Sequence, residues 1–140
     1  MTGRGGHRDY SATPLVRKLG LVTAKGGVGD VAVVGEPEGF RALLGELPGS
    51  VRLHARMQPN TSLALCFVRS RAELDAMVDM LAAQLPRSAH VWILHPKAQR
   101  KPDFNQNHVR DEGLARGLVD YKVGSVDADW SGLKFAWRAT

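Results

Sequence analysis

A basic segment after a predicted strand is the part of the sequence best suited to chemistry. Lys97, Arg100 and Lys101 follow the apolar run 91–94 and precede a predicted helix, and Asn105 lies in its first turn. Lysine and arginine side chains bind phosphates and carboxylates, and the start of a helix adds free backbone N–H groups. The segment therefore predicts a site for a small anionic ligand. Its alternative interpretation is a solvated polar loop.

A glycine-containing turn is the second candidate for ligand contact. Gly35, Pro37 and Gly39 lie in a turn that follows the apolar run 31–34. Glycine lets the backbone approach a ligand closely. Ligands of open parallel sheets bind outside the carboxyl ends of the strands. We therefore expect this turn and the basic segment to meet at one edge of the sheet.

A third group, Asp127, Trp130, Ser131 and Lys134, lies in or beside a predicted hairpin tip. Tryptophan is enriched at binding hot spots, which favours an interaction surface. The alternative is a turn lock, in which Asp127 and Ser131 satisfy turn amides and the Trp130 ring folds back on the sheet. On either interpretation we expect Asp127, Trp130 and Lys134 to form one surface cluster.

Metal binding and covalent catalysis have little support in the sequence. The five histidines include no helical i,i+4 pair and have no cysteine beside them. Ser70 and Ser131 lack the context of a nucleophile elbow, and no pair of carboxylates stands out as an acid–base couple. The single cysteine, Cys66, lies in an apolar run, which is typical of a core residue in a reducing compartment. We therefore expect no metal, no cofactor and no catalytic residues.

One glycine-rich segment is similar to a nucleotide-binding loop but departs from it at a critical position. Residues 25–30 read Lys-Gly-Gly-Val-Gly-Asp. Asp30 stands where the phosphate-binding loop of nucleotide hydrolases needs a lysine, and the segment precedes a strand instead of following one. The segment is therefore predicted to be a plain turn into the next strand.

Positive charge is concentrated at the N-terminus. The chain has 140 residues and a formal net charge of +5, and its first 25 residues hold five basic side chains and one acidic side chain. Residues 1–12 are polar and glycine-rich, which predicts a flexible basic tail before a single domain at 13–140. Nucleic acid would bind only through this tail. Because no apolar segment suits a membrane span or a secretory signal, we expect a cytoplasmic protein without membrane contact.

The apolar pattern predicts an α/β fold. Two apolar runs, 63–68 and 91–94, flank a helical pattern at 71–85, and Ser70 and Glu73 have capping-box spacing at its start. A helix between two such strands makes a parallel crossover, which is right-handed in nearly all proteins.

The remaining patterns complete a single-domain, three-layer Rossmann-like sheet, mostly parallel, that ends in an antiparallel C-terminal hairpin. Further strands are predicted at 31–34, 51–57, 121–126 and 133–137, and shorter helices at 15–19 and 40–47. The cap spacing of Asp103 and Gln106 predicts one more helix before the hairpin. With the strands numbered in chain order, the expected spatial order is 2-1-3-4-6-5. This order requires the short link from Met57 to Leu63 to pass the first strand.

Six phrases of the sequence carry a resemblance to a known family. They are Thr13-Pro-Leu, Pro37-Glu-Gly-Phe40, Ser70-Arg-Ala-Glu-Leu74, Pro96-Lys97, Gly117-Leu-Val-Asp-Tyr-Lys-Val123 and Asp127-x-x-Trp-Ser-Gly-Leu-Lys134. Together they resemble a family of small bacterial proteins known as domain of unknown function 3052, over about residues 10–138. The resemblance implies a fold and brings no activity with it.

The order of elements also resembles a shortened methyltransferase-type Rossmann sheet, whose last two strands pair antiparallel. That resemblance implies a methyl-donor pocket with a glycine-rich first turn and an acidic residue at the end of the second strand. Here Pro37 removes a backbone donor from the first turn, and the second strand ends in residues 54–57 without a carboxylate.

Two functional hypotheses follow from these observations. The first is a non-catalytic binding or regulatory protein that recognises a protein partner or an anionic small ligand. The alternative is a degenerate methyltransferase-like or nucleotide-ligand enzyme that uses the turn Gly35–Gly39. The sequence predicts no oligomeric state.

Overall fold

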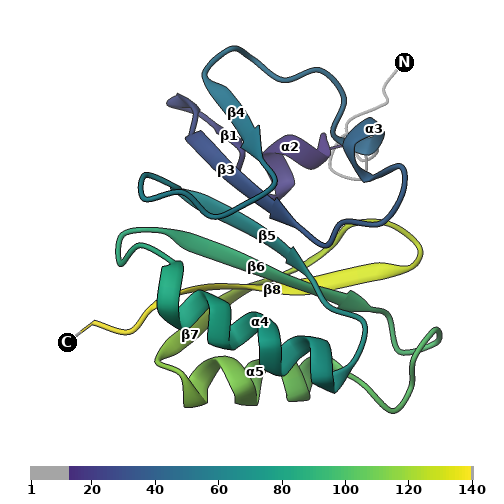
Figure 1. Cartoon of the computed structure of the whole chain (residues 1–140). Helices are drawn as coiled ribbons and strands as arrows, with labels where there is room; N and C mark the ends of the chain where they lie inside the picture. Colours follow the sequence, from purple (N-terminus) through teal and green to yellow (C-terminus); the bar gives the residue numbers. More distant parts are fainter. Residues whose placement is uncertain (1–12, 140) are drawn as a thin grey trace.

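Six strands form one sheet between two helix layers in a computed structural model of the chain, which describes residues 13–139 (Figure 1). The strands are β3 (Gly29–Val34), β4 (Val51–His54), β5 (Leu63–Phe67), β6 (His90–Pro96), β7 (Leu118–Ser125) and β8 (Trp130–Trp137). Their spatial order is β4-β3-β5-β6-β8-β7. Strands β4, β3, β5 and β6 pair in parallel, and β8 runs antiparallel to both of its neighbours. The predicted fold class and strand order are confirmed.

Helices cover both faces of this sheet. The helices α4 (Arg71–Gln84) and α5 (Gln106–Ala115) pack on one face, and the short helices α2 (Leu15–Lys18) and α3 (Phe40–Leu44) lie on the other (Figure 1). Between α2 and β3 the chain forms a small hairpin of β1 (Val22–Thr23) and β2 (Gly26–Gly27). The segment predicted as a plain turn therefore contains a two-residue strand and the start of β3.

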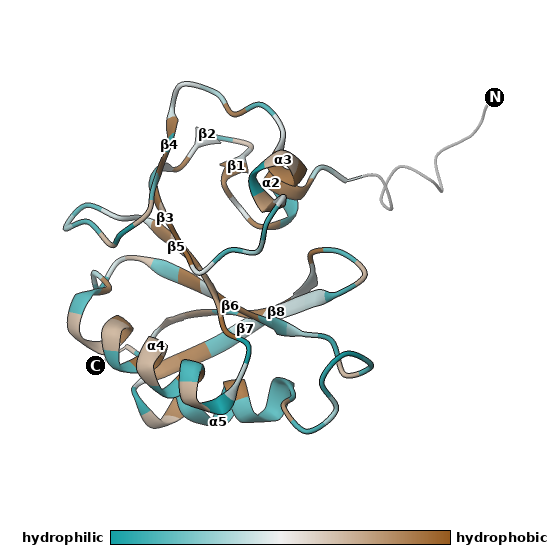
Figure 2. Ribbon diagram, turned by 45° about the vertical axis from the view of Figure 1, so that its right-hand side comes forward, coloured by the Kyte–Doolittle hydropathy of each residue, from teal (hydrophilic) through white to brown (hydrophobic). Residues whose placement is uncertain are grey.

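Each face of the sheet carries its own apolar core, and β5 contributes to both. All five of its residues are buried. Because side chains alternate along a strand, Ala64 and Cys66 join the core beneath α4 and α5, whereas Leu65 and Phe67 join the opposite core. Figure 2 colours β5 as hydrophobic, which is the composition expected of a strand buried on both faces.

The helix boundaries depend on local capping. Ser70 Oγ accepts a hydrogen bond from the Glu73 N–H at 3.1 Å, which confirms the predicted start of α4. The helix α5 begins after Asn105, whose side chain accepts from two backbone N–H groups of the first turn, so the predicted cap at Asp103 is wrong. The helix α3 is shorter than predicted because the chain turns away at Gly45, where φ is 75°.

The link between β4 and β5 passes β3 without a helix. It runs over residues 55–62, and Met57 within it packs against the core beneath α4. The Gln58 N–H donates to Thr61 Oγ1 at 2.8 Å, which closes a local turn. Because β4 has only four residues, a short link is long enough to return to the start of β5.

The predicted basic tail, residues 1–12, lies outside the described residues. Within residues 13–139, no helix is long and apolar enough to cross a membrane. The same range contains no group of three histidine, cysteine or acidic side chains placed to hold a metal ion.

Candidate ligand-binding site

A polar cavity lies where β6 ends and α5 begins, and we call it the β6–α5 cavity. Its volume is about 290 Å³. Its wall consists of His95, Lys97, Ala98, Gln99, Asn105, Gln106 and Ser131. Lys97, Asn105 and Ser131 were predicted from two separate parts of the sequence, and the structure brings them to one cavity. Arg100 and Lys101 do not line it, and Arg100 instead pairs with Asp129 at 2.6 Å.

Backbone hydrogen bonds hold Lys97 at the rim of this cavity. Its N–H donates to the Asp129 carbonyl at 2.7 Å, and its own carbonyl accepts from the N–H groups of Arg100 and Lys101 at 2.8 and 3.1 Å. These bonds make a tight turn directly after β6. The Lys97 ammonium is therefore carried by an ordered backbone, and no carboxylate belongs to the wall of the cavity.

Asn105 has two roles in the same place. Its Oδ1 accepts from the N–H groups of Asn107 and His108 at 2.9 and 3.4 Å, which caps α5. Its own N–H donates to His108 Nδ1 at 3.2 Å, which completes a capping box. Within residues 13–139 its Nδ2 makes no hydrogen bond, so the amide N–H₂ remains available to a ligand.

His95 is a buried acceptor in the wall of the cavity. Only 4% of the residue is exposed. Its Nδ1 lies 3.0 Å from the Pro96 carbonyl, which only accepts, so Nδ1 carries the proton. Its Nε2 is buried and has no hydrogen-bond partner within the described chain. Burial lowers the pKa of His95, opposed in part by the Pro96 carbonyl, so the ring is neutral near pH 7.

Ser131 reaches the cavity from β8, opposite His95 in the β6–β8 register. Its hydroxyl donates to the Gly124 carbonyl at 2.9 Å, so its proton is committed to the hairpin and its oxygen can act only as an acceptor. Ser131 Oγ and the Nε2 of the neutral His95 ring therefore both present acceptors to the cavity.

The glycine-containing turn lines a different cavity. This second cavity, of about 420 Å³, lies beside the carboxyl ends of β3 and β5 and has a largely apolar wall. It is lined by Val34, Gly35, Phe67, Arg69, Glu73, Ala76, Met77 and Met80. Pro37 and Gly39 are not part of its wall. The turn and the basic segment both lie at the carboxyl-end edge of the parallel strands, as expected, but they line separate cavities there.

The backbone at Gly35 is closely packed. Its φ is 74°, and a Cβ at this position would lie 2.9 Å from the Phe67 carbonyl oxygen. The Gly35 carbonyl accepts from Arg69 Nη2 at 2.8 Å. The glycine therefore allows β3 to turn against the end of β5, and its carbonyl is already engaged by a side chain of the protein.

The hairpin tip has the geometry expected of a turn lock at two of its three predicted members, Asp127 and Trp130. Asp127 Oδ1 accepts from the N–H groups of Asp129 and Trp130 at 2.8 and 2.9 Å. The Trp130 ring packs edge-on against Phe67 with centroids 5.2 Å apart, and the Arg69 guanidinium lies 5.3 Å from its centroid.

Lys134 does not join this cluster, and the prediction of one cluster is wrong for it. Its Nζ lies 5.9 Å from the centroid of the Trp92 ring and beside Gly20. The physical reason is that β8 remains extended from Trp130 onward, which carries residue 134 about 13 Å along the strand. The predicted alternation is confirmed, because Leu133 and Phe135 lie in the core on the opposite face.

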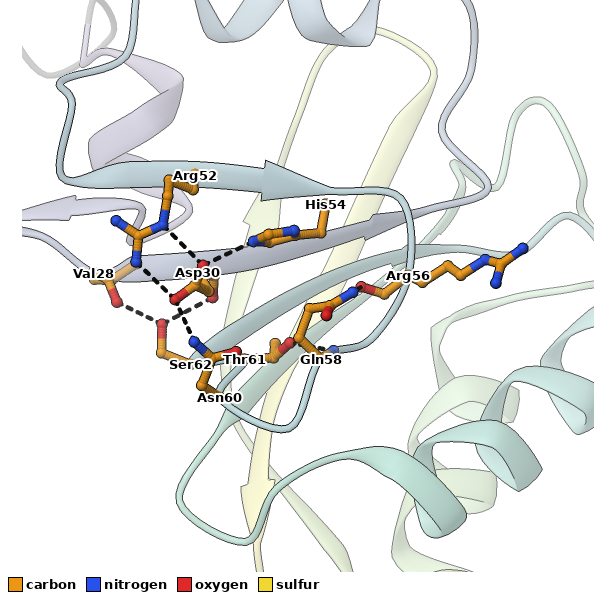
Figure 3. Close-up of polar contacts among 9 residues, drawn as sticks. All are labelled: Val28, Asp30, Arg52, His54, Arg56, Gln58, Asn60, Thr61 and Ser62. Carbon is orange, nitrogen blue, oxygen red and sulfur yellow. Dashed lines mark hydrogen bonds and ion pairs between the residues drawn. The ribbon is translucent and has the colours of Figure 1, made fainter.

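The densest polar cluster was not predicted as a site, and it gathers around Asp30 (Figure 3). Oδ1 of Asp30 accepts from Arg52 Nε at 3.0 Å and from His54 Nε2 at 2.8 Å. Oδ2 accepts from Arg52 Nη2 and from Asn60 Nδ2, both at 2.9 Å. These hydrogen bonds, from Arg52 first and His54 second, hold the pKa of Asp30 at about 2.

The hydrogen bonds of this Asp30 cluster connect three segments of the chain. They join β3, β4 and the link that passes between β4 and β5, and both carboxylate oxygens are already occupied by two donors each. A carboxylate bonded in this way is a poor base. The sequence did contain a sign of this cluster. In residues 51–57, Arg52 and His54 alternate with apolar residues, so both lie on the polar face of the strand, where an acidic residue could pair with them.

Comparison with known proteins identifies a family and a fold. A family model described as "Protein of unknown function (DUF3052)" matches residues 53–139. No curated protein matches the chain.

Several solved structures are similar in fold. One is the PH0226 protein from Pyrococcus horikoshii OT3, with 9% identity, a TM-score of 0.58 and coverage of 98% of this chain and 94% of that one. Another is the N-methyltransferase NodS from Bradyrhizobium japonicum WM9 in complex with S-adenosyl-L-homocysteine, with 14% identity, a TM-score of 0.55 and coverage of 98% and 90%. At these identities the likeness establishes a methyltransferase-like fold alone.

Proposed function

The chain belongs to a family of proteins of unknown function (DUF3052), and we propose that it is a binding protein for a small anionic ligand held in the β6–α5 cavity. One observation carries the proposal. Lys97, Asn105 and Ser131 come from a loop, a helix cap and a strand and line one cavity whose wall contains no carboxylate. The cavity lies at the carboxyl end of β6, where open parallel sheets bind ligands.

Lys97 and Asn105 supply the side-chain donors in this proposal, whereas His95 Nε2 and Ser131 Oγ can only accept and would meet a hydroxyl group of the ligand. The Lys97 ammonium supplies the positive charge, since His95 is neutral near pH 7. The free N–H₂ of Asn105 donates to a ligand oxygen, while its Oδ1 keeps the start of α5 in place. The nearby first turn of α5 adds the positive end of a helix dipole. A phosphate or carboxylate group matches this set of donors.

A methyltransferase-like enzyme is the alternative, and the fold of structures such as NodS favours it. The residues fit a methyl donor poorly. The Gly35 carbonyl is engaged by Arg69, Pro37 has no backbone N–H, and β4 ends at His54 without a carboxylate for ribose hydroxyls.

Thermal unfolding with a ligand panel tests the proposal. The panel contains inorganic phosphate, glycerol 3-phosphate, citrate, adenosine monophosphate, S-adenosylmethionine and S-adenosyl-L-homocysteine. We expect at least one of the first four anions to stabilise the protein, by about 2.7 kcal/mol when it is present at a hundred times its dissociation constant.

Two matched variants locate the site. Lys97→Met removes the ammonium from the cavity and should abolish the ligand-induced shift. Lys101→Met removes the same charge from a neighbouring position outside the cavity wall and should leave the shift nearly unchanged. Stabilisation by S-adenosylmethionine alone would favour the enzyme, and a panel without any shift would favour recognition of a protein partner. Either result would contradict the proposed function.

A further inference from the structure

A third cavity, of about 240 Å³, lies at the opposite end of the parallel strands, and we call it the Lys134 cavity. It lies beside β1 and the first residues of β5 and β6. Its wall consists of Gly20, Thr23, Val28, Ser62, Leu63, His90, Tyr121 and Lys134. It shares no residue with the β6–α5 cavity.

Local packing directs the Lys134 amine into this region. Leu133 and Phe135 are buried in the core on the α4 side, so Lys134 lies on the other face of β8. Its stem passes Trp92, and its Nζ lies 5.9 Å from that ring centroid. Gly20 leaves room for the amine, since a Cβ there would lie 2.7 Å from Nζ. The side chain is therefore partly buried.

The Lys134 amine has no counter-ion among the residues that the structure describes. Within residues 13–139 it makes no ion pair and no hydrogen bond, and no acidic residue lines the cavity. The nearest charged partner in register is Lys122, directly across from it on β7. Burial, and then the charge of Lys122, lower the pKa of Lys134. Desolvation and a neighbouring cation are the two conditions that activate lysine as a nucleophile.

A neutral histidine shares the cavity with this amine. His90 Nδ1 forms a hydrogen bond with Tyr121 Oη, and the two rings meet edge-on with centroids 5.5 Å apart. Burial, and then the charge of Lys134, lower the pKa of His90, while burial raises the pKa of the Tyr121 phenol. Near pH 7 the pair is therefore uncharged and can accept and return one proton.

We propose that Lys134 is a nucleophilic amine that forms an imine with a small aldehyde or ketone in the Lys134 cavity. The neutral Nζ attacks the carbonyl carbon, a C–N bond forms as the C–O π bond breaks, and the carbonyl oxygen takes one proton from solvent to become a hydroxyl. His90 takes a proton from the nitrogen and returns it to the departing hydroxyl. One water leaves and a protonated imine remains, so the step involves no oxidation or reduction.

Reductive trapping tests this proposal on the full chain. The protein is incubated at pH 7 with propanal and sodium cyanoborohydride, and the rate of alkylation at each lysine is measured by peptide mass spectrometry. We expect Lys134 to react faster than the exposed Lys122, because burial and the neighbouring cation raise the fraction of neutral amine at Lys134. Labelling of Lys134 at or below the rate of Lys122 would overturn the proposal.

Three variants test whether Lys134 is labelled because its neighbours activate the amine or only because the aldehyde can reach it. Lys122→Met removes the neighbouring charge and should slow labelling at Lys134. His90→Gln keeps a polar side chain but removes the base, and should slow it as well. The control variant Lys101→Met changes a residue that lines neither cavity, and it should leave the labelling of Lys134 unchanged. Equal labelling of Lys134 in the first two variants, with thermal unfolding close to that of the parent protein, would contradict activation by these neighbours. The labelling of Lys134 involves no residue of the β6–α5 cavity, so its result is independent of the proposed anion site.

Discussion

His54 Nε2 donates a hydrogen bond of 2.8 Å to Asp30 Oδ1, and this contact joins β4 to β3 at the point where the chain leaves β4 for an unusually short crossover. Arg52 and Asn60 bind the same carboxylate, so one acidic side chain fastens two strands and the following link (Figure 3). No helix lies between β4 and β5, and the hydrogen bond from Asn60 to Asp30 ties this link to the sheet instead.

We predict that the stability supplied by Asp30 is lost in acid. The pKa of this carboxyl is about 2 in the folded protein, below the ordinary value of 3.8. A lowered folded-state pKa stabilises the protein above the ordinary value, and this contribution disappears as the pH falls from about 4 towards 2. Chemical denaturation at several pH values measures the effect.

Asp30→Asn is the matching variant for this prediction. It should unfold at a lower denaturant concentration at pH 7 and should have a shallower loss of stability between pH 4 and pH 2 than the parent protein. Parallel acid profiles for the two proteins would show that another carboxylate is responsible.

Trp130→Ala should destabilise the hairpin tip, because the ring packs on Phe67 and is partly buried. We expect a loss of about 2 kcal/mol, below the 3–5 kcal/mol typical of a fully buried tryptophan. Trp130→Phe keeps a ring at the contact and should recover most of that loss. Unchanged stability in the alanine variant, measured by urea unfolding, would favour a contact surface over a turn lock.

Two glycines of the candidate turn differ in a way that mutagenesis can measure. Gly35 and Gly39 both have positive φ, but a Cβ at Gly35 would lie 2.9 Å from the Phe67 carbonyl oxygen, whereas at Gly39 it would meet nothing within 4 Å. Gly39→Ala should therefore cost about 1 kcal/mol from backbone strain alone. Gly35→Ala should cost about 1–3 kcal/mol more from the close approach. Equal losses in urea unfolding would mean that β3 and β5 are not tightly packed there.

Gly113 is predicted to resist replacement despite its position within α5. Alanine is a better helix former than glycine by about 1 kcal/mol, so the local pattern alone favours Gly113→Ala. A Cβ there would lie 2.6 Å from Phe135 Cε2, and Phe135 is completely buried. We therefore expect a net loss of about 1–2 kcal/mol in unfolding free energy. A gain in stability would show that the Phe135 ring can move to make room for the alanine Cβ at little cost.

Local sequence patterns were sufficient for most of the fold. The apolar run at 63–68 and the cap at Ser70 identified β5 and α4, because burial and capping depend on residues close in the chain. Local patterns did not predict that Asn105, and not Asp103, caps α5. Both residue types can cap a helix, and the position of the preceding loop decides which one does.

The sites were determined by contacts between distant residues. The types of Lys97 and Asn105 indicated anion binding, but their meeting with Ser131 depends on the antiparallel register that places Ser131 opposite His95. The same register carries Lys134 away from Trp130. Asp30 is the clearest case, because its partners Arg52 and Asn60 lie 22 and 30 residues away. Side-chain type follows from the sequence alone, whereas which groups share a cavity or a charge depends on strand pairing across the whole sheet.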